Sequence, residues 1–140
     1  MKKIFLLFIV TSLFSCSKDD NSAVASPIVG SWEVISYETR QGTGSWQNAN
    51  QACRLDDIED YASNGDWTKY DGTNQCAAGT GITRGTWELK ANNSKVVYTY
   101  EGVPGEYEST IELLDEETLI VSFSAGDLDN TQFKVTYAKN

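Results

Sequence analysis

Residues 83–101 read TRGTWELKANNSKVVYTYE and contain two strand patterns separated by a turn. In the first half, Trp87 and Leu89 are two positions apart, and in the second half Val96, Tyr98 and Tyr100 alternate with their neighbours. This period of two is typical of strands that bury one face. The four residues between the halves, ANNS, have the composition of a tight hairpin turn. The stretch therefore predicts an antiparallel hairpin.

The same period of two recurs on both sides of this hairpin. No window shows the apolar stripe and end caps of a helix. We expect about eight strands, the number in a small closed up-and-down antiparallel barrel, so the predicted fold class is all-β. The expected strands cover residues 30–38, 55–62, 66–70, 83–90, 95–101, 106–114, 118–125 and 131–138.

The connections between these strands alternate in length. They are tight at residues 63–65, 91–94 and 115–117, whereas the first and third connections span residues 39–54 and 71–82. Alternate connections of an antiparallel meander lie at the same end. We therefore expect one end closed by tight turns and one end rimmed by longer loops. The first strand would enter at the closed end, so the rim would point away from the N-terminal segment.

The N-terminal residues have the pattern of an export signal. Lys2 and Lys3 precede an apolar run, residues 4–10, that is too short for a stable membrane span. Residues 13–16, Leu-Phe-Ser-Cys, resemble a bacterial lipobox, which implies lipidation of Cys16. The alternative is an ordinary signal peptide with a chance cysteine. This interpretation divides the chain into a lipoprotein signal peptide (1–15), a flexible tether (16–27) and one barrel domain (28–140).

Residues 17–20, Ser-Lys-Asp-Asp, resemble the surface-export signal of lipoproteins in the Bacteroidota, with a solvated linker as the alternative. The two resemblances imply an outer membrane lipoprotein on the periplasmic or cell-surface face. Its membrane contact would be the lipid on Cys16, because each buried CH2 group contributes roughly 0.8 kcal/mol and a lipoprotein carries several chains.

The chain is acidic and contains no histidine. It carries 11 basic and 20 acidic side chains, and loss of residues 1–15 would remove two lysines and no acid, leaving a net charge of −11. This balance excludes nucleic acid as a partner, since phosphate contacts need clustered Lys and Arg. The missing histidine excludes Ser-His-Asp and Cys-His catalysis and His-ligated zinc.

Three cysteines divide into one and two. If Cys16 takes the lipid, Cys53 and Cys76 remain as a pair in an oxidising compartment, where a disulfide is expected. Both lie in or beside the two longest connections, which meet at the same rim. A bridge closing a loop of this length would contribute roughly 3–4 kcal/mol in the chain-entropy model. A pair of free thiols is the alternative.

Several short motifs resemble lipocalins. Gly30-Ser31-Trp32 is similar to the Gly-x-Trp signature, and residues 85–89 followed by 96–100 resemble lipocalin-like domains of Bacteroidota lipoproteins. The resemblance covers nearly all of residues 28–139. It implies an up-and-down barrel whose cup can hold a small hydrophobic molecule. The chain departs from typical lipocalins in being short and in lacking a clear helix outside the barrel.

Inward residues of an eight-stranded barrel either fill it or enclose one small ligand. Most of the expected inward series is bulky and is interpreted as core: Trp32, Val34, Trp87, Leu89, Val96, Tyr98, Ile111, Leu113, Val121, Val135 and Tyr137. Inward residues near the rim are the better candidates for ligand contact, because they mix apolar walls with hydroxyl groups. These candidates are Ser36, Tyr100, Ser109, Phe123 and Phe133. Trp46, in the first long loop, is expected either to fold over the rim as a lid or to pin that loop to the barrel.

Two acidic segments, residues 56–60 and 126–130, invite a calcium interpretation. Neither has the alternating spacing and terminal glutamate of the twelve-residue calcium loop, so we interpret both as solvated faces. Nothing fixes two carboxylates at a shared cleft, as a glycosidase would need. We therefore expect no catalytic residue, no metal and no cofactor.

Two functions remain as hypotheses. The first is a lipid-anchored cell-envelope protein that binds a small hydrophobic molecule in its cup. The second is a solid barrel whose rim loops contact a protein partner or inhibit an enzyme. A packed interior would favour the second hypothesis, and an open cavity would favour the first.

Overall fold

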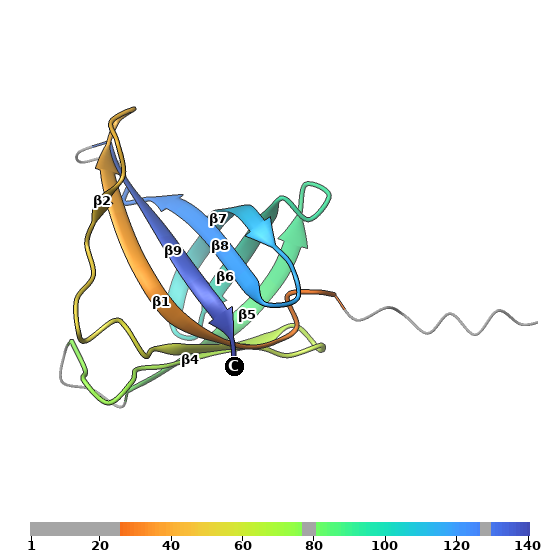
Figure 1. The fold of residues 1–140 in the computed structure, drawn as a ribbon. Helices are drawn as coiled ribbons and strands as arrows, with labels where there is room; N and C mark the ends of the chain where they lie inside the picture. Colours follow the sequence, from red (N-terminus) through yellow and green to blue (C-terminus); the bar gives the residue numbers. More distant parts are fainter. Residues whose placement is uncertain (1–25, 77–80, 127–129) are drawn as a thin grey trace, which may run out of the picture.

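The computed structural model describes residues 26–76, 81–126 and 130–140, and within these ranges the chain forms one antiparallel sheet of nine strands (Figure 1). Consecutive strands pair with each other along most of the chain, except that β1 contacts β2, β3 and β9. The strands are β1 (Gly30–Gln41), β2 (Gln47–Asn48), β3 (Ile58–Tyr61), β4 (Asp66–Tyr70), β5 (Ile82–Lys90), β6 (Lys95–Tyr100), β7 (Val103–Leu114), β8 (Thr118–Ser124) and β9 (Thr131–Lys139).

The sheet closes because β9 returns to pair with β1. Their register runs from Trp32 opposite Lys139 to Gln41 opposite Thr131. The closed wall consists of eight strands, β1 and β3 to β9, and the two-residue β2 is added to β1 near the rim. The predicted all-β, eight-stranded antiparallel up-and-down barrel is therefore confirmed.

The two ends of the barrel differ in the way that the connection lengths predicted. At the closed end, the turn between β7 and β8 is held by Asp115, whose Oδ1 accepts hydrogen bonds from the backbone N–H of Glu117 (2.9 Å) and of Thr118 (2.7 Å). The N-terminal part of the domain also lies here. Ile28 is fully buried, and its carbonyl accepts a hydrogen bond from Trp32 Nε1 (2.7 Å). The longer connections lie at the opposite end, the rim (Figure 1).

The barrel interior contains a packed apolar core, and part of that core also borders the cavity described below. The core combines residues from all parts of the wall, so the strands cannot separate without exposing apolar surface. Trp87, Leu89 and Ile111 are partly buried against this core, as is Leu114. The buried core residues are Ile28, Trp32, Val34, Tyr61, Trp67, Val96, Tyr98, Leu119, Val121, Val135 and Tyr137.

One residue of the expected inward series faces out. The register of β7 against β8 shifts between Ile111 and Leu113, which is the signature of a β-bulge at Glu112. The extra residue reverses the alternation, so Leu113 is 42% exposed and Leu114 packs against the core instead. The inward prediction for Leu113 is therefore wrong, because strict alternation holds only where no bulge intervenes.

Gly85 allows two aromatic rings to meet across a strand. It lies in β5 between Trp67 of β4 and Tyr100 of β6, in register with both. The Trp67 and Tyr100 ring centroids are 5.4 Å apart in an edge-to-face arrangement. A Cβ atom on Gly85 would overlap the carbonyl oxygen of Thr99. The glycine is thus required by close approach of the backbone, as is usual for glycine inside a strand.

Replacing Gly85 with alanine should lower the free energy of unfolding by about 3 kcal/mol, the upper part of the range for overpacking. Gly42→Ala is the matched control. Gly42 has φ +53° and nothing within 4 Å of an added Cβ, so only backbone strain of about 1 kcal/mol is expected. Urea unfolding of both variants measures the difference. Equal stability of the two variants would contradict the packing argument.

Candidate functional site

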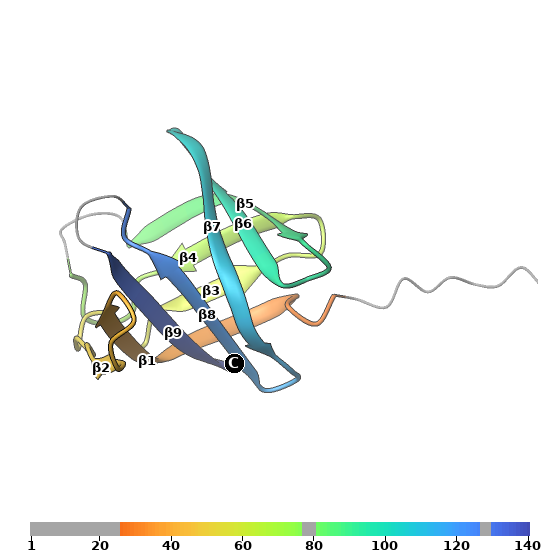
Figure 2. The ribbon, with the colours of Figure 1, turned by 90° about the horizontal axis from the view of Figure 1, so that it is seen from above.

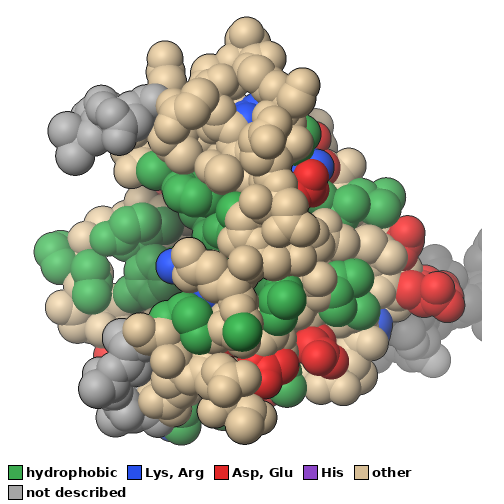
Figure 3. Space-filling view, turned by 60° about the vertical axis from the view of Figure 1, so that its left-hand side comes forward, with side chains coloured by type: hydrophobic (Ala, Val, Ile, Leu, Met, Phe, Trp, Pro, Cys, Tyr) green, Lys and Arg blue, Asp and Glu red, His purple; other side chains and the backbone are tan. Residues whose placement is uncertain are grey.

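The rim half of the barrel encloses a cavity of about 580 Å³. Hydrophobic side chains gather around a hollow on the face shown in Figure 3. The wall is rich in aromatic residues and also carries charged groups. The cavity is lined by Val34, Tyr37, Arg54, Asp57, Glu59, Trp67, Lys69, Tyr98, Tyr100, Glu106, Tyr107, Glu108, Ser109, Val121, Phe123, Ser124, Ala125, Gly126, Val135 and Tyr137.

The cavity lies beside a seam between β7 and β8. β7 pairs with β8 only from Thr110 to Leu114, so the part of β7 before Thr110 is not paired with β8. Figure 2 shows this part of β7 diverging from β8. Tyr107 and Ser109 line the cavity on one side of the seam, and Phe123 lines it on the other. The cavity wall therefore includes residues from both sides of the place where the two strands diverge.

The floor of the cavity is a carboxylate surrounded by aromatic hydrogen-bond donors. Glu59 Oε2 accepts hydrogen bonds from Tyr61 Oη (2.8 Å) and Trp67 Nε1 (3.0 Å), and Oε1 accepts one from Tyr137 Oη (2.9 Å). The hydroxyl groups of Tyr61 and Tyr98 are 2.7 Å apart. Only 7% of Glu59 is exposed. The network joins β3, β4, β6 and β9 across the barrel.

Burial sets the protonation behaviour of this network. It raises the pKa of Glu59 above the usual 4.5, although the hydrogen bonds from Tyr61, Trp67 and Tyr137 oppose the shift. It also raises the pKa of Tyr61, Tyr98 and Tyr137 well above 10, and the nearby Glu59 carboxylate adds to this rise. The tyrosines therefore keep their protons and remain donors. No lysine or arginine of the described residues lies within 4.0 Å of the Glu59 carboxylate.

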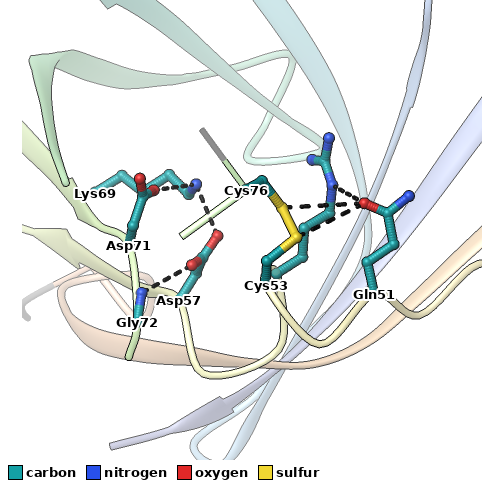
Figure 4. The surroundings of a disulfide bond; sticks show 8 residues. Gln51, Cys53, Asp57, Lys69, Asp71, Gly72 and Cys76 are labelled. Carbon is teal, nitrogen blue, oxygen red and sulfur yellow. Dashed lines mark hydrogen bonds and ion pairs between the residues drawn. A yellow bond between two sulfur atoms is a disulfide. The ribbon is translucent and has the colours of Figure 1, made fainter. Parts of the chain in front are cut away.

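A separate charged group lies on the wall near the rim. Lys69 Nζ contacts Asp57 Oδ2 (2.7 Å) and Asp71 Oδ1 (3.0 Å), and Asp57 Oδ1 accepts a hydrogen bond from the Gly72 N–H (3.0 Å). Figure 4 shows these side chains beside the disulfide. Burial alone would lower the pKa of Lys69, but the two carboxylates outweigh it and raise the pKa. Lys69 is thus held as a cation with both of its partners supplied by the protein.

The predicted disulfide between Cys53 and Cys76 is present. It joins the segment before β3 to the segment after β4, at the rim (Figure 4). Gln51 Oε1 lies 4.0 Å from each sulfur, which is a van der Waals contact because a disulfide has no S–H to donate. The bridge also fixes the backbone beside Arg54, whose guanidinium carbon lies 5.1 Å from the Tyr37 ring centroid.

The structure brings together three of the rim candidates. Tyr100, Ser109 and Phe123 line the cavity. Phe133 is not among the lining residues but packs against Phe123 (ring centroids 5.5 Å apart) and against Tyr37 (5.7 Å). Contact of these residues with a ligand stays a prediction. Cys16, the predicted lipidation site, lies outside the described residues.

Ser36 does not line the cavity, because β1 contains a second bulge. Its register against β9 shifts between Val34 and Ser36, and Ile35 is 52% exposed. After the shift, Tyr37 is opposite the buried Val135 and Ser36 is opposite Thr136. The inward position predicted for Ser36 is therefore wrong, and Tyr37 takes that position.

Trp46 is held against the outer wall. Its ring lies 4.3 Å from the guanidinium carbon of Arg40 and 4.7 Å from Lys134 Nζ. Lys134 in turn forms an ion pair with Glu38 (2.6 Å). Of the two roles expected for Trp46, the arrangement fits a residue that pins its loop to the barrel, and the lid is not seen.

Sequence reasoning missed the polar floor. The acidic pattern of residues 56–60 predicts a solvated face, but Asp57 and Glu59 are buried, at 3% and 7% exposure. The signal was present, since Asp57, Glu59 and Tyr61 alternate on one face of the strand. Among the described residues, no three His, Cys, Asp or Glu side chains cluster to hold a metal. Residues 127–129 of the second acidic segment lie outside the described residues.

The chain resembles a known protein in structure but not in sequence. No protein-family model matches the chain, and no curated protein matches it. A search of solved structures found a lipocalin-like protein from Bacteroides uniformis with 14% sequence identity and a TM-score of 0.49. The match covers 82% of this chain and 100% of that chain. The fold assignment itself rests on the strand order and the β1–β9 closure of this chain.

The raised pKa of Glu59 predicts a pH-dependent contribution to stability. The folded state holds the Glu59 proton more tightly than the unfolded chain, so this residue's contribution to the free energy of unfolding falls as pH rises from about 4.5 through the folded-state pKa. Glu59→Gln cannot ionise and should therefore gain stability relative to the native chain across that window. Urea unfolding of both chains between about pH 4 and pH 8 measures the difference. A difference that stays constant with pH would contradict this assignment.

Proposed function

We propose that this protein is a non-enzymatic binding protein whose barrel cavity holds a small, largely apolar molecule. The observation that carries the proposal is the cavity of about 580 Å³ in the rim half of an otherwise packed barrel. Its volume lies within the range of small-molecule sites, about 300–1,000 Å³. The proposal includes no catalytic step and no cofactor.

The chemistry of the wall supports this proposal. Tyr37, Tyr100, Tyr107 and Phe123 surround the upper part of the cavity and offer large apolar surfaces. The Tyr100 and Tyr107 rings meet edge to face with centroids 4.7 Å apart, so this wall is built of mutually packed aromatic groups. Apolar walls with a few polar groups are what small-molecule sites usually present.

The proposed location is the outer membrane, through a lipid on Cys16 after removal of residues 1–15. The support is the lipobox-like Leu-Phe-Ser-Cys sequence at residues 13–16. Ile28 is buried at the closed end of the barrel, so a tether at residues 16–27 would leave the cavity mouth pointing away from the lipid. None of the described segments forms a helix long and apolar enough to cross a bilayer.

Cys16→Ser should move the protein from the membrane fraction to the soluble fraction, because the serine cannot carry the thioether-linked lipid. Fractionation of cells followed by immunoblotting measures the distribution. Ser17→Ala, one residue further along, is the matched control and should stay with membranes. Retention of Cys16→Ser in the membrane fraction would contradict the lipid anchor.

The cavity itself is tested by filling it. Ser109 is 7% exposed and lines the cavity, whereas Thr110 is exposed at the next position of the same strand, on the opposite face. Ser109→Phe should weaken binding of a neutral aromatic probe, 1-naphthalenemethanol, by about tenfold or more, since the new ring occupies the probe's space. Thr110→Phe should leave binding unchanged.

Isothermal titration calorimetry measures the affinities, and thermal melts confirm that both variants are folded. Equal affinities of the Ser109→Phe and Thr110→Phe variants for the probe would place its site outside the barrel and contradict the proposal.

The second hypothesis, contact with a protein partner, keeps one supporting observation. The first part of β7 is unpaired on the side facing β8, and Val103 and Tyr107 there are 48% and 44% exposed. Such a strand edge can accept an extended peptide. The solid interior that this hypothesis assumed is not seen, since the rim half is hollow.

A further inference from the structure

Resting on the proposed function, we propose that the molecule held in the cavity is a small organic cation, with a protonated amine placed against Glu59 on the cavity floor. The amine would donate a hydrogen bond to Glu59 Oε1. The apolar part of the molecule would extend toward the aromatic wall at the rim.

Glu59 has hydrogen-bonding capacity that the described residues do not use. A carboxylate has about four acceptor positions, two on each oxygen. Among the described residues, Oε2 accepts two hydrogen bonds, from Tyr61 and Trp67, whereas Oε1 accepts one, from Tyr137. Glu59 also lines the cavity. One acceptor position on Oε1 is therefore open to a donor from the ligand.

The Glu59 carboxylate forms no ion pair with another described residue. The three groups that donate to Glu59 are neutral, so they satisfy its hydrogen bonds without balancing its charge. Lys69, one of the two cations that line the cavity, contacts Asp57 and Asp71 instead. The other, Arg54, lies over the Tyr37 ring. Lys69 therefore acts on Glu59 only at a distance. A buried carboxylate without a counter-charge in contact is costly, and a bound cation would supply the contact that the described residues do not.

Aromatic side chains surround Glu59 on the cavity floor. Trp67, Tyr98 and Tyr137 line the cavity around the carboxylate, and the Trp67 and Tyr98 rings lie 5.3 Å apart. Aromatic rings stabilise desolvated cations through their electron-rich faces. The floor thus combines the two groups that recognise an organic ammonium, a carboxylate and an aromatic enclosure.

The charge of the whole chain agrees with this choice. The net charge is −9, which raises the local concentration of cations and opposes the entry of anions. An anionic ligand could pair with Arg54, but the carboxylates of Glu59 and Asp57, which also line the cavity, would repel it. The interior therefore favours a cation over an anion of the same shape.

The experiment compares three probes with the same ring and different charge: 1-naphthylmethylamine, 1-naphthalenemethanol and 1-naphthoate. Affinities are measured by isothermal titration calorimetry on the full-length chain in detergent-free buffer at about pH 7.5. The amine should bind about tenfold or more tightly than the alcohol, and the carboxylate should bind most weakly. Equal affinity for amine and alcohol would overturn the cation proposal while leaving cavity binding intact. Binding of none of the three probes would overturn both.

Glu59→Gln then tests whether the preference arises at the floor. It should lower amine affinity about tenfold or more and leave alcohol affinity within about twofold. Asp60→Asn is the control, because it removes the same charge one position along β3, on the opposite face of the strand. It should preserve the preference for the amine. If both variants lost the same amine affinity, the preference for the amine would come from the net charge of the protein, and the assignment to Glu59 would be overturned.

Discussion

The pairing of β1 with β9 is the constraint on which the rest of the molecule depends. Without it, the chain would be an open meander whose inward faces could not enclose a volume. With it, the first and last strands satisfy each other's backbone groups and remove two edges from the sheet. Closure also directs the side chains of every strand alternately into one interior. What that interior contains then follows from the residues at the inward positions.

The interior is divided along its length. Toward the closed end, Ile28 and Trp32 fill the space under the tight turns, and the wall meets in a continuous apolar core. Toward the rim, β7 and β8 diverge, because β7 pairs with β8 only from Thr110 onward and the part of β7 before Thr110 is not paired with β8. Between the two halves lies Glu59, held by donors from three other positions of the barrel. The carboxylate therefore marks the boundary between packed core and cavity, and it is the group best placed to recognise what enters.

Much of this architecture could be predicted from the sequence, since the period of two and the short turns locate strands by local rules. The alternation of loop lengths also predicted which end is closed and brought Cys53 and Cys76 to one rim. The prediction that Ser36 and Leu113 point inward was wrong, because each residue follows a β-bulge that reverses the alternation of inward and outward side chains. A bulge depends on how two strands fit together, so a single strand's pattern does not reveal it.

The polar floor was harder to predict for a different reason. A run of acidic residues is usually solvated, and burial of Glu59 is tolerable because donors from three strands converge on its carboxylate. Tyr137, one of these donors, is 78 positions away in the sequence. Trp46 is a second case, because its place on the outer wall depends on contacts with Arg40 of β1 and Lys134 of β9, which are far apart in the sequence but on paired strands.

The central claim is that the cavity holds a small organic cation, and native mass spectrometry of the protein isolated from its own cell envelope tests it most directly. We expect a complex that is heavier than the bare chain. On unfolding, this complex should release a small molecule that carries a basic amine. As a control, 1-naphthylmethylamine is added to a second sample, and the complex of the protein with this amine should survive the same transfer to the gas phase. A bare chain alongside an intact control complex, or a released molecule that is neutral or acidic, would contradict the account.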